Sequence, residues 1–128
     1  MESDVLVVDD SAAIRKILQR VLRQTGMAIR TIYEAGDGQE ALSLLAGHSV
    51  ELILTDINMP KMDGLQLLAS VKASARWRDI PVVMITTEGG ETKVAEAVKL
   101  GAAGYVRKPF TADQIKEKLA GFLEPISL

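Results

Sequence analysis

Glu51-Leu52-Ile53-Leu54-Thr55-Asp56, followed by Ile57-Asn58-Met59-Pro60-Lys61-Met62-Asp63-Gly64, contains a short apolar run that ends at an aspartate. A second run, Asp4-Val5-Leu6-Val7-Val8, ends in the acidic pair Asp9-Asp10. Short, uninterrupted apolar runs are typical of strands buried on both faces of a parallel sheet. If the two strands are parallel, their three carboxylates meet at the carboxyl edge, where open α/β sheets bind ligands. Clustered carboxylates cannot all stay ionised without a cation, so the sequence predicts a divalent metal site.

Apolar runs alternate with amphipathic segments along the whole chain, which favours a parallel sheet covered by helices. The expected strands are Asp4–Asp9, Thr31–Ala35, Leu52–Thr55, Ile80–Thr86 and Ala103–Arg107. The expected helices follow Ser11, span Gln39–Ala46, begin at Asp63 or Gly64, span Glu91–Leu100 and follow Thr111. Apolar residues at helical spacing predict the buried faces of the first and last helices. They are Ile14, Ile17, Leu18, Val21 and Leu22 in the first helix, and Ile115, Leu119, Phe122 and Leu123 in the last.

Composition limits the classes of protein that remain. A chain of 128 residues predicts a single domain, residues 1–128, without room for a fused output domain. The formal charge of −2 gives no reason to expect nucleic-acid binding, and the absence of cysteine excludes disulfides and thiolate metal sites. No segment is apolar over enough residues to span a bilayer, so we expect a cytoplasmic protein without membrane association.

The polar residues at the expected strand ends form an ordered set: Asp9-Asp10, Asp56, Thr86 and Lys108-Pro109. This set, together with the Asp-x-Asn-Met-Pro-x-Met-Asp-Gly string at Asp56, resembles the receiver domain of bacterial two-component response regulators. The resemblance covers essentially the whole chain and is closest to the stand-alone chemotaxis type. It implies a flavodoxin-like (βα)5 fold with strand order 2-1-3-4-5, in which the first and third strands are neighbours.

Asp56 is the expected nucleophile. A carboxylate is ionised at neutral pH and can attack phosphorus to form an acyl phosphate. Such a transfer needs positive charge around the phosphoryl oxygens more than it needs a base. Mg²⁺ prefers oxygen ligands, and we expect Asp10, Asp56 and the backbone carbonyl of Asn58 to bind it, with Asp9 bound directly or through water.

The resemblance also implies the remaining roles. Lys108 would contact a phosphoryl oxygen, Thr86 would donate its hydroxyl to the phosphoryl group, and Tyr105 would rotate into the space that Thr86 leaves. This switch would change the face formed by Glu91–Leu100, Ala103–Arg107 and Thr111–Glu124. A cis peptide bond is expected before Pro109. Asn58 and Glu88 would flank the water that hydrolyses the acyl phosphate, which predicts a phosphoryl lifetime of seconds to a few minutes.

The expected partners are a histidine kinase as phosphodonor and a target such as a flagellar motor switch protein, with the protein itself a monomer. A phosphorelay shuttle, a phosphate sink and a regulator of another signalling enzyme stay open as alternatives. Each residue also has a structural interpretation when taken alone, such as a helix cap for Asp10 or a surface turn for Lys108-Pro109. An aspartyl-phosphate phosphatase of the haloacid-dehalogenase type is less favoured, because Asn58 occupies the position of its general acid. A metal-free pseudo-receiver is disfavoured because every position of the site is filled.

Overall fold

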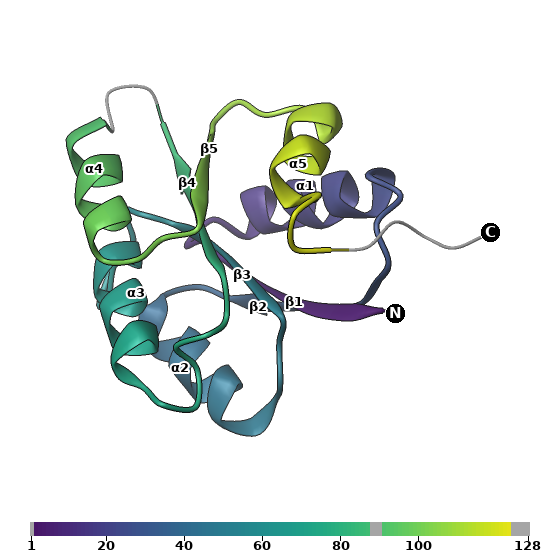
Figure 1. Ribbon diagram of the computed structural model, residues 1–128. Helices are drawn as coiled ribbons and strands as arrows, with labels where there is room; N and C mark the ends of the chain where they lie inside the picture. Colours follow the sequence, from purple (N-terminus) through teal and green to yellow (C-terminus); the bar gives the residue numbers. More distant parts are fainter. Residues whose placement is uncertain (1, 88–90, 124–128) are drawn as a thin grey trace.

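The computed structural model describes residues 2–87 and 91–123 and shows a five-stranded parallel sheet between two layers of helices (Figure 1). The strand order is β2-β1-β3-β4-β5, as the resemblance predicts. The strands are β1 (Ser3–Val8), β2 (Ile29–Ala35), β3 (Leu52–Asp56), β4 (Val82–Thr86) and β5 (Gly104–Arg107). The helices are α1 (Ala12–Gln24), α2 (Gly38–Gly47), α3 (Gly64–Ala73), α4 (Glu91–Lys99) and α5 (Ala112–Leu119). None of the helices in the described ranges has the length and apolar character needed to cross a bilayer.

The core consists of two clusters of apolar side chains, one on each face of the sheet, because successive side chains of each strand point to opposite faces. Leu52 and Leu54 pack on the face covered by α1 and α5, whereas Ile53 packs on the face covered by α2, α3 and α4 (Figure 1). Because successive side chains of a strand point to opposite faces, residue parity predicts the face on which each strand end presents its polar group. Both clusters consist almost entirely of aliphatic residues, consistent with the aromatic content of 4%.

The helix starts follow from local sequence. The side chains of Ser11, Asp63 and Thr111 each accept a hydrogen bond from a backbone N–H in the first turn of α1, α3 and α5, respectively. Such caps satisfy donors that have no partner within the helix, and each contributes about 1 kcal/mol. The cap of α1 is therefore Ser11 and not Asp10, which leaves the Asp10 carboxylate available for another role.

Several expectations about boundaries and burial were wrong. The second strand begins at Ile29 and not at Thr31. The fourth strand begins at Val82 and not at Ile80, because the intervening proline has no N–H to contribute to the sheet. The last helix ends at Leu119, so Phe122 lies beyond it and is exposed, while Glu124 lies outside the described residues. Ile17 is 45% exposed, since it lies at the edge of the apolar stripe whose centre is occupied by Leu18 and its neighbours.

Candidate functional site

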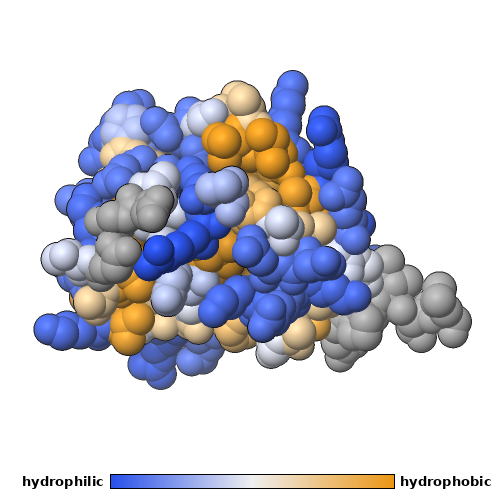
Figure 2. Space-filling view, turned by 90° about the horizontal axis from the view of Figure 1, so that it is seen from above, coloured by the Kyte–Doolittle hydropathy of each residue, from blue (hydrophilic) through white to orange (hydrophobic). Residues whose placement is uncertain are grey.

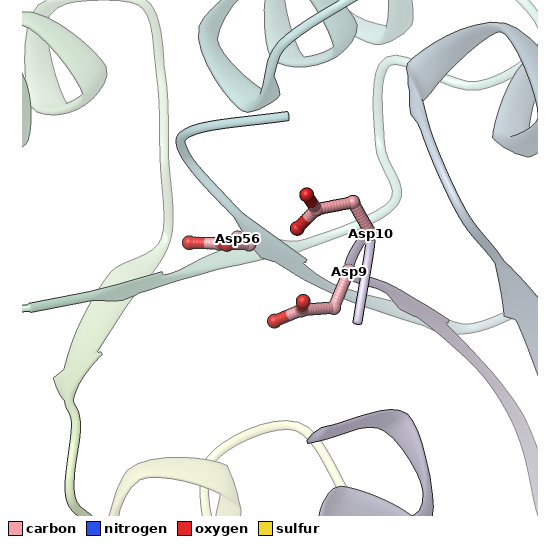
Figure 3. Close-up of side chains that lie close together, drawn as sticks. All are labelled: Asp9, Asp10 and Asp56. Atoms are coloured by element: carbon pink, nitrogen blue, oxygen red, sulfur yellow. The ribbon is translucent and has the colours of Figure 1, made fainter. Parts of the chain in front are cut away.

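Three carboxylates meet where β1 and β3 end. Asp9 and Asp10 directly follow β1, Asp56 is the last residue of β3, and these two strands are hydrogen-bonded neighbours. One oxygen of each carboxylate lies within 4.8 Å of the others, and Figure 3 shows the three side chains around a common space. Asp9 is buried, Asp56 is partly buried and Asp10 is exposed, so the cluster extends from the core to solvent.

Lys108 brings a positive charge to this cluster from the end of β5. Its Nζ lies 3.0 Å from Oδ2 of Asp9 and 3.4 Å from Oδ2 of Asp56. Asp9, Asp56 and Lys108 continue the parity of the strand residues that face α1 and α5, which is why their side chains converge. The peptide bond between Lys108 and Pro109 is cis, as expected. One ammonium faces three carboxylates, which leaves two formal negative charges uncompensated within the cluster.

The electrostatic consequences appear at Asp56 and Lys108. Burial raises the pKa of the Asp56 carboxyl, with a further contribution from the charge of Asp9, and Lys108 only partly opposes this shift. Burial lowers the pKa of the Lys108 ammonium, but the hydrogen bond to Asp9 and the charges of Asp9 and Asp56 together outweigh it, so the pKa lies above its usual value. The ionised form of Asp56 is therefore disfavoured by its surroundings, and additional positive charge would stabilise it.

The backbone around Asp56 is held by a close approach of Gly64. A Cβ atom at Gly64 would lie 2.2 Å from the carbonyl oxygen of Asp56, so glycine is the residue that fits. The N–H of Gly64 donates to the carbonyl of Ile57 at 2.8 Å, and the N–H of Ile57 donates to Oδ1 of Asp56, also at 2.8 Å. These contacts orient the Asp56 carboxylate from its own chain. They explain why a glycine follows the strand end at this spacing.

The donor set fits a hard divalent cation. Mg²⁺ binds oxygen ligands at about 2.1 Å, so ligands on opposite sides of the ion lie about 4.2 Å apart. The separations in the cluster are within 4.8 Å, which small side-chain movements would close. Asp9 is the most deeply buried of the three, and its Oδ1 accepts from the N–H of Ser11 and its Oδ2 from Lys108. Asp10 is exposed and Asp56 is partly buried, so these two carboxylates are the best placed to bind an ion directly.

The side chain of Asn58 has a partner that the sequence analysis missed. Nζ of Lys93, in the first turn of α4, donates to Oδ1 of Asn58 at 2.7 Å. The two residues are 35 positions apart, and a lysine in the first turn of a helix is an ordinary solvent-exposed residue by sequence alone. Glu88, the other residue expected beside the attacking water, lies outside the described residues.

Thr86 and Tyr105 lie on the same face of the sheet, opposite to the face of Lys108. β4 and β5 pair with Met84 opposite Tyr105, and Thr86 follows on the same side as Met84. The Thr86 hydroxyl is buried and donates to the carbonyl of Thr87 at 3.2 Å. Tyr105 is half-exposed, lies between α4 and α5, and has Nζ of Lys118 at 5.3 Å from its ring centroid.

The surface beside Lys108 is apolar. Figure 2 looks onto the side of the molecule that carries the β5–α5 connection, where an apolar patch interrupts a largely hydrophilic surface. A groove in this part of the molecule has a volume of about 410 Å³. It is lined by Ile14, Ile17, Thr87, Lys108, Pro109 and Phe110. The exposed Ile17 that departs from the sequence expectation thus belongs to this groove.

Comparison with known proteins agrees with this geometry. Residues 5–120 match the response regulator receiver domain family. The chain belongs to this family. It is 42% identical over 120 residues to the chemotaxis protein CheY homolog of Campylobacter jejuni, covering 93% of this chain and 91% of that protein. It is 39% identical to the chemotaxis protein CheY of Pseudomonas aeruginosa, covering 96% and 98%.

A solved structure shows the same fold. The chemotaxis response regulator CheY4 of Vibrio cholerae superimposes on this receiver with a TM-score of 0.85 at 31% identity, covering 96% of this chain and 100% of that one. The predicted resemblance to receivers of the CheY type is confirmed. Proteins of this kind are signalling proteins and not classical enzymes, and receiver domains bind Mg²⁺ at an acidic pocket.

We expect Mg²⁺ to raise the melting temperature of this receiver, because an ion that binds the folded cluster stabilises it by linkage. At a concentration of about ten times the dissociation constant the gain is about 1.4 kcal/mol, or about 4 to 6 °C. Asp10→Asn should weaken this response and raise the melting temperature without metal, since it removes one of three mutually repelling charges. Differential scanning calorimetry across a Mg²⁺ titration measures both effects.

Asp37→Asn is the matched control, because Asp37 caps α2 outside the cluster and asparagine caps equally well. It should respond to Mg²⁺ as the wild type does. An Asp10→Asn variant with the full metal response would remove Asp10 from the expected ligands.

Proposed function

We propose that this receiver accepts a phosphoryl group on Asp56 from a histidine kinase, with Mg²⁺ bound at the acidic cluster, and thereby regulates a protein partner in chemotaxis. The observation that carries the proposal is the position of the Lys108 ammonium, which reaches Asp56 and Asp9 at once from a third strand end. The family and the names of the similar chemotaxis proteins support the pathway.

The chemistry follows from the charges. An Asp56 oxygen attacks the phosphorus of the donor, a new bond to the carboxylate forms, and the bond to the leaving group breaks with its electron pair. The ammonium of Lys108 lies 3.4 Å from the Asp56 carboxylate and is close enough to contact an oxygen of the attached phosphoryl group. Asp10, Asp56 and the backbone carbonyl of Asn58 would hold a Mg²⁺ ion, which would supply further positive charge to the phosphoryl group. Asp9 keeps Lys108 in place through its own hydrogen bond.

The apolar groove beside Lys108 supports a protein as the donor. A protein donor must bring its phosphoryl group to Asp56, and the wall of the groove includes the lysine that contacts Asp56. An exposed apolar surface next to a charged site is typical of a protein-binding surface. We further propose that the protein acts in the cytoplasm, where its kinase and its target would act. We also propose that it is a monomer and that the signal leaves through its own surface.

The proposed output is the face formed by α4, β5 and α5. A phosphoryl group on Asp56 would draw the Thr86 hydroxyl away from the carbonyl of Thr87, which it now contacts at 3.2 Å. Tyr105 lies on the same side of the sheet and lines a groove with Val94 and Ala95 of α4, into which its ring can turn. Phosphorylation would thus shift an equilibrium between two arrangements of this face.

The test of the function is phosphoryl uptake. Intact-mass measurement after incubation with acetyl phosphate and Mg²⁺ should show the addition of a single phosphoryl group, and chelation of the metal should suppress it. Transfer from a phosphorylated histidine kinase should modify the same residue. A protein that takes up no phosphoryl group from either donor would be a pseudo-receiver.

The switch predicts a localised response to a phosphoryl mimic. Beryllofluoride should shift the backbone amide NMR signals of α4, β5 and α5 more than those of α1 and α2, because Thr86 and Tyr105 adjoin the first group. Thr86→Val removes the hydroxyl at nearly constant volume and should suppress the shifts in β5 and α5. Thr87→Val, at the exposed neighbouring position, should leave them intact. Shifts confined to the loops that bear Asp9, Asp56 and Lys108 would contradict the switch.

A further inference from the structure

Lys93 stands at an electrostatically unfavourable place in α4. The helix begins at Glu91, so the ammonium of Lys93 belongs to the first turn, where the positive end of the helix dipole disfavours a cation. Lys99, by contrast, lies in the last turn, where a cation is favoured. The contact that compensates Lys93 is the hydrogen bond from its Nζ to Oδ1 of Asn58 at 2.7 Å. A charge-assisted bond of this length connects α4 with the loop that follows β3.

This bond weakens the carboxamide of Asn58 as an acceptor for other groups. A carboxamide has one acceptor oxygen, with two lone pairs, and a donor NH₂ group. Lys93 takes one of these lone pairs in a charge-assisted bond. A nearby water molecule that donates to the same oxygen must therefore share it with an ammonium group.

The hydrolysis of a phosphoryl group on Asp56 is faster when such an acceptor orients the attacking water. A water oxygen forms a bond to phosphorus while the bond from phosphorus to the Asp56 oxygen breaks and leaves its electron pair on the carboxylate. Inorganic phosphate is released, and the proton lost by the water passes to phosphate or solvent. When a carbonyl oxygen accepts a hydrogen bond from the water, the lone pair of the water oxygen can point toward phosphorus. An NH₂ group would instead donate a hydrogen bond to that lone pair of the water.

We propose that Lys93 is a positioning residue that prolongs the lifetime of the phosphoryl group on Asp56 by competing with the attacking water for the carboxamide oxygen of Asn58. The inference rests on the proposed function and adds a control of signal duration from α4. Because Lys93 belongs to α4, any partner that draws its ammonium away from Asn58 would shorten the signal.

The test is the decay of the phosphorylated protein after removal of acetyl phosphate, followed by phosphate release. Lys93→Met removes the ammonium and should speed the decay by about threefold to tenfold, the rate equivalent of one net hydrogen bond. Lys93→Arg keeps a cationic donor and should stay within about twofold of the wild type. Lys99→Met removes the same charge from the same helix and should leave the decay unchanged.

A second background shows whether Lys93 acts through Asn58. In an Asn58→Ala protein the carboxamide is gone, so adding Lys93→Met should change the decay by less than about a factor of 1.5. In the unphosphorylated protein, Lys93→Met should shift the NMR signals of the Asn58 side-chain NH₂ group, which Lys99→Met should not do.

Different results would contradict the proposed function and the role of Lys93. A wild type that takes up no phosphoryl group overturns the proposed function and, with it, this inference. Normal uptake with the same decay in Lys93→Met overturns this inference alone. So does an acceleration of equal size in the Asn58→Ala background, because Lys93 would then act without the carboxamide.

Discussion

Asp56→Asn should abolish phosphoryl uptake from acetyl phosphate, with no residual transfer to the neighbouring carboxylates. Asparagine has nearly the same shape, but its amide carries no charge and is a far weaker nucleophile than a carboxylate. Asp9 cannot substitute for it, because it is only 1% exposed and is not accessible to a phosphodonor. Intact-mass spectrometry with Mg²⁺ present measures the loss. The same variant should melt at a higher temperature without metal, since burial disfavours the charge that it removes.

Asp63→Asn is the matched control for this variant. It lies in the same loop, seven residues further along the chain, and its carboxylate caps α3 instead of joining the cluster. Asparagine is an equally good cap, so both uptake and stability should match the wild type. Equal phosphorylation of the Asp56→Asn protein would show that another residue is the acceptor.

Gly64→Ala should destabilise the protein strongly, because Gly64, the first residue of α3, lies against the backbone of Asp56 and Ile57. The new Cβ would lie 2.2 Å from the Asp56 carbonyl oxygen and 2.9 Å from Cα of Ile57, and both are backbone atoms that cannot rotate aside. Overpacking against fixed atoms costs about 3 kcal/mol, at the upper end of such substitutions. The loop must move to relieve the contact, so the response to Mg²⁺ should fall together with the free energy of unfolding. Urea unfolding at equilibrium, with and without Mg²⁺, measures both.

Gly47→Ala adds the same methyl group where nothing lies within 4 Å. Gly47 is the last residue of α2, and alanine is the better helix former there, so stability should stay equal or rise by up to about 1 kcal/mol. Equal stabilities for the two alanine variants would show that the approach of Gly64 to Asp56 does not constrain the site.

Several features of the site follow from contiguous sequence. The apolar run that ends at Asp56 forms a strand buried on both faces, and the caps at Ser11, Asp63 and Thr111 start their helices, because these structures depend on alternation and on hydrogen bonds within a few residues. The strand order came from the family resemblance, and the structure has the same order. The resemblance was based on polar residues at strand ends, which lie at one edge of the sheet because the strands are parallel.

The single-residue assignments at the cluster depended on the fold. By sequence, Asp9 and Asp10 are both candidate metal ligands, whereas in the structure the first is buried against Lys108 and the second is exposed. The sequence analysis assigned Lys108 to an incoming phosphoryl group, and in the unphosphorylated protein its ammonium contacts Asp9 and Asp56. These contacts depend on the fold, because they join strand ends that lie far apart in the chain.

The amino-acid sequence by itself determined that this protein is a layered α/β domain with carboxylates, a threonine and a lysine at successive strand ends, since the periods of helix and strand and the capping residues are local properties. Only the tertiary structure decided that Lys93 holds Asn58 and that Ile17 lies in a groove beside Lys108. Such contacts join side chains from elements far apart in the chain. They depend on how the crossover helices lie against the sheet, which no short stretch of sequence specifies.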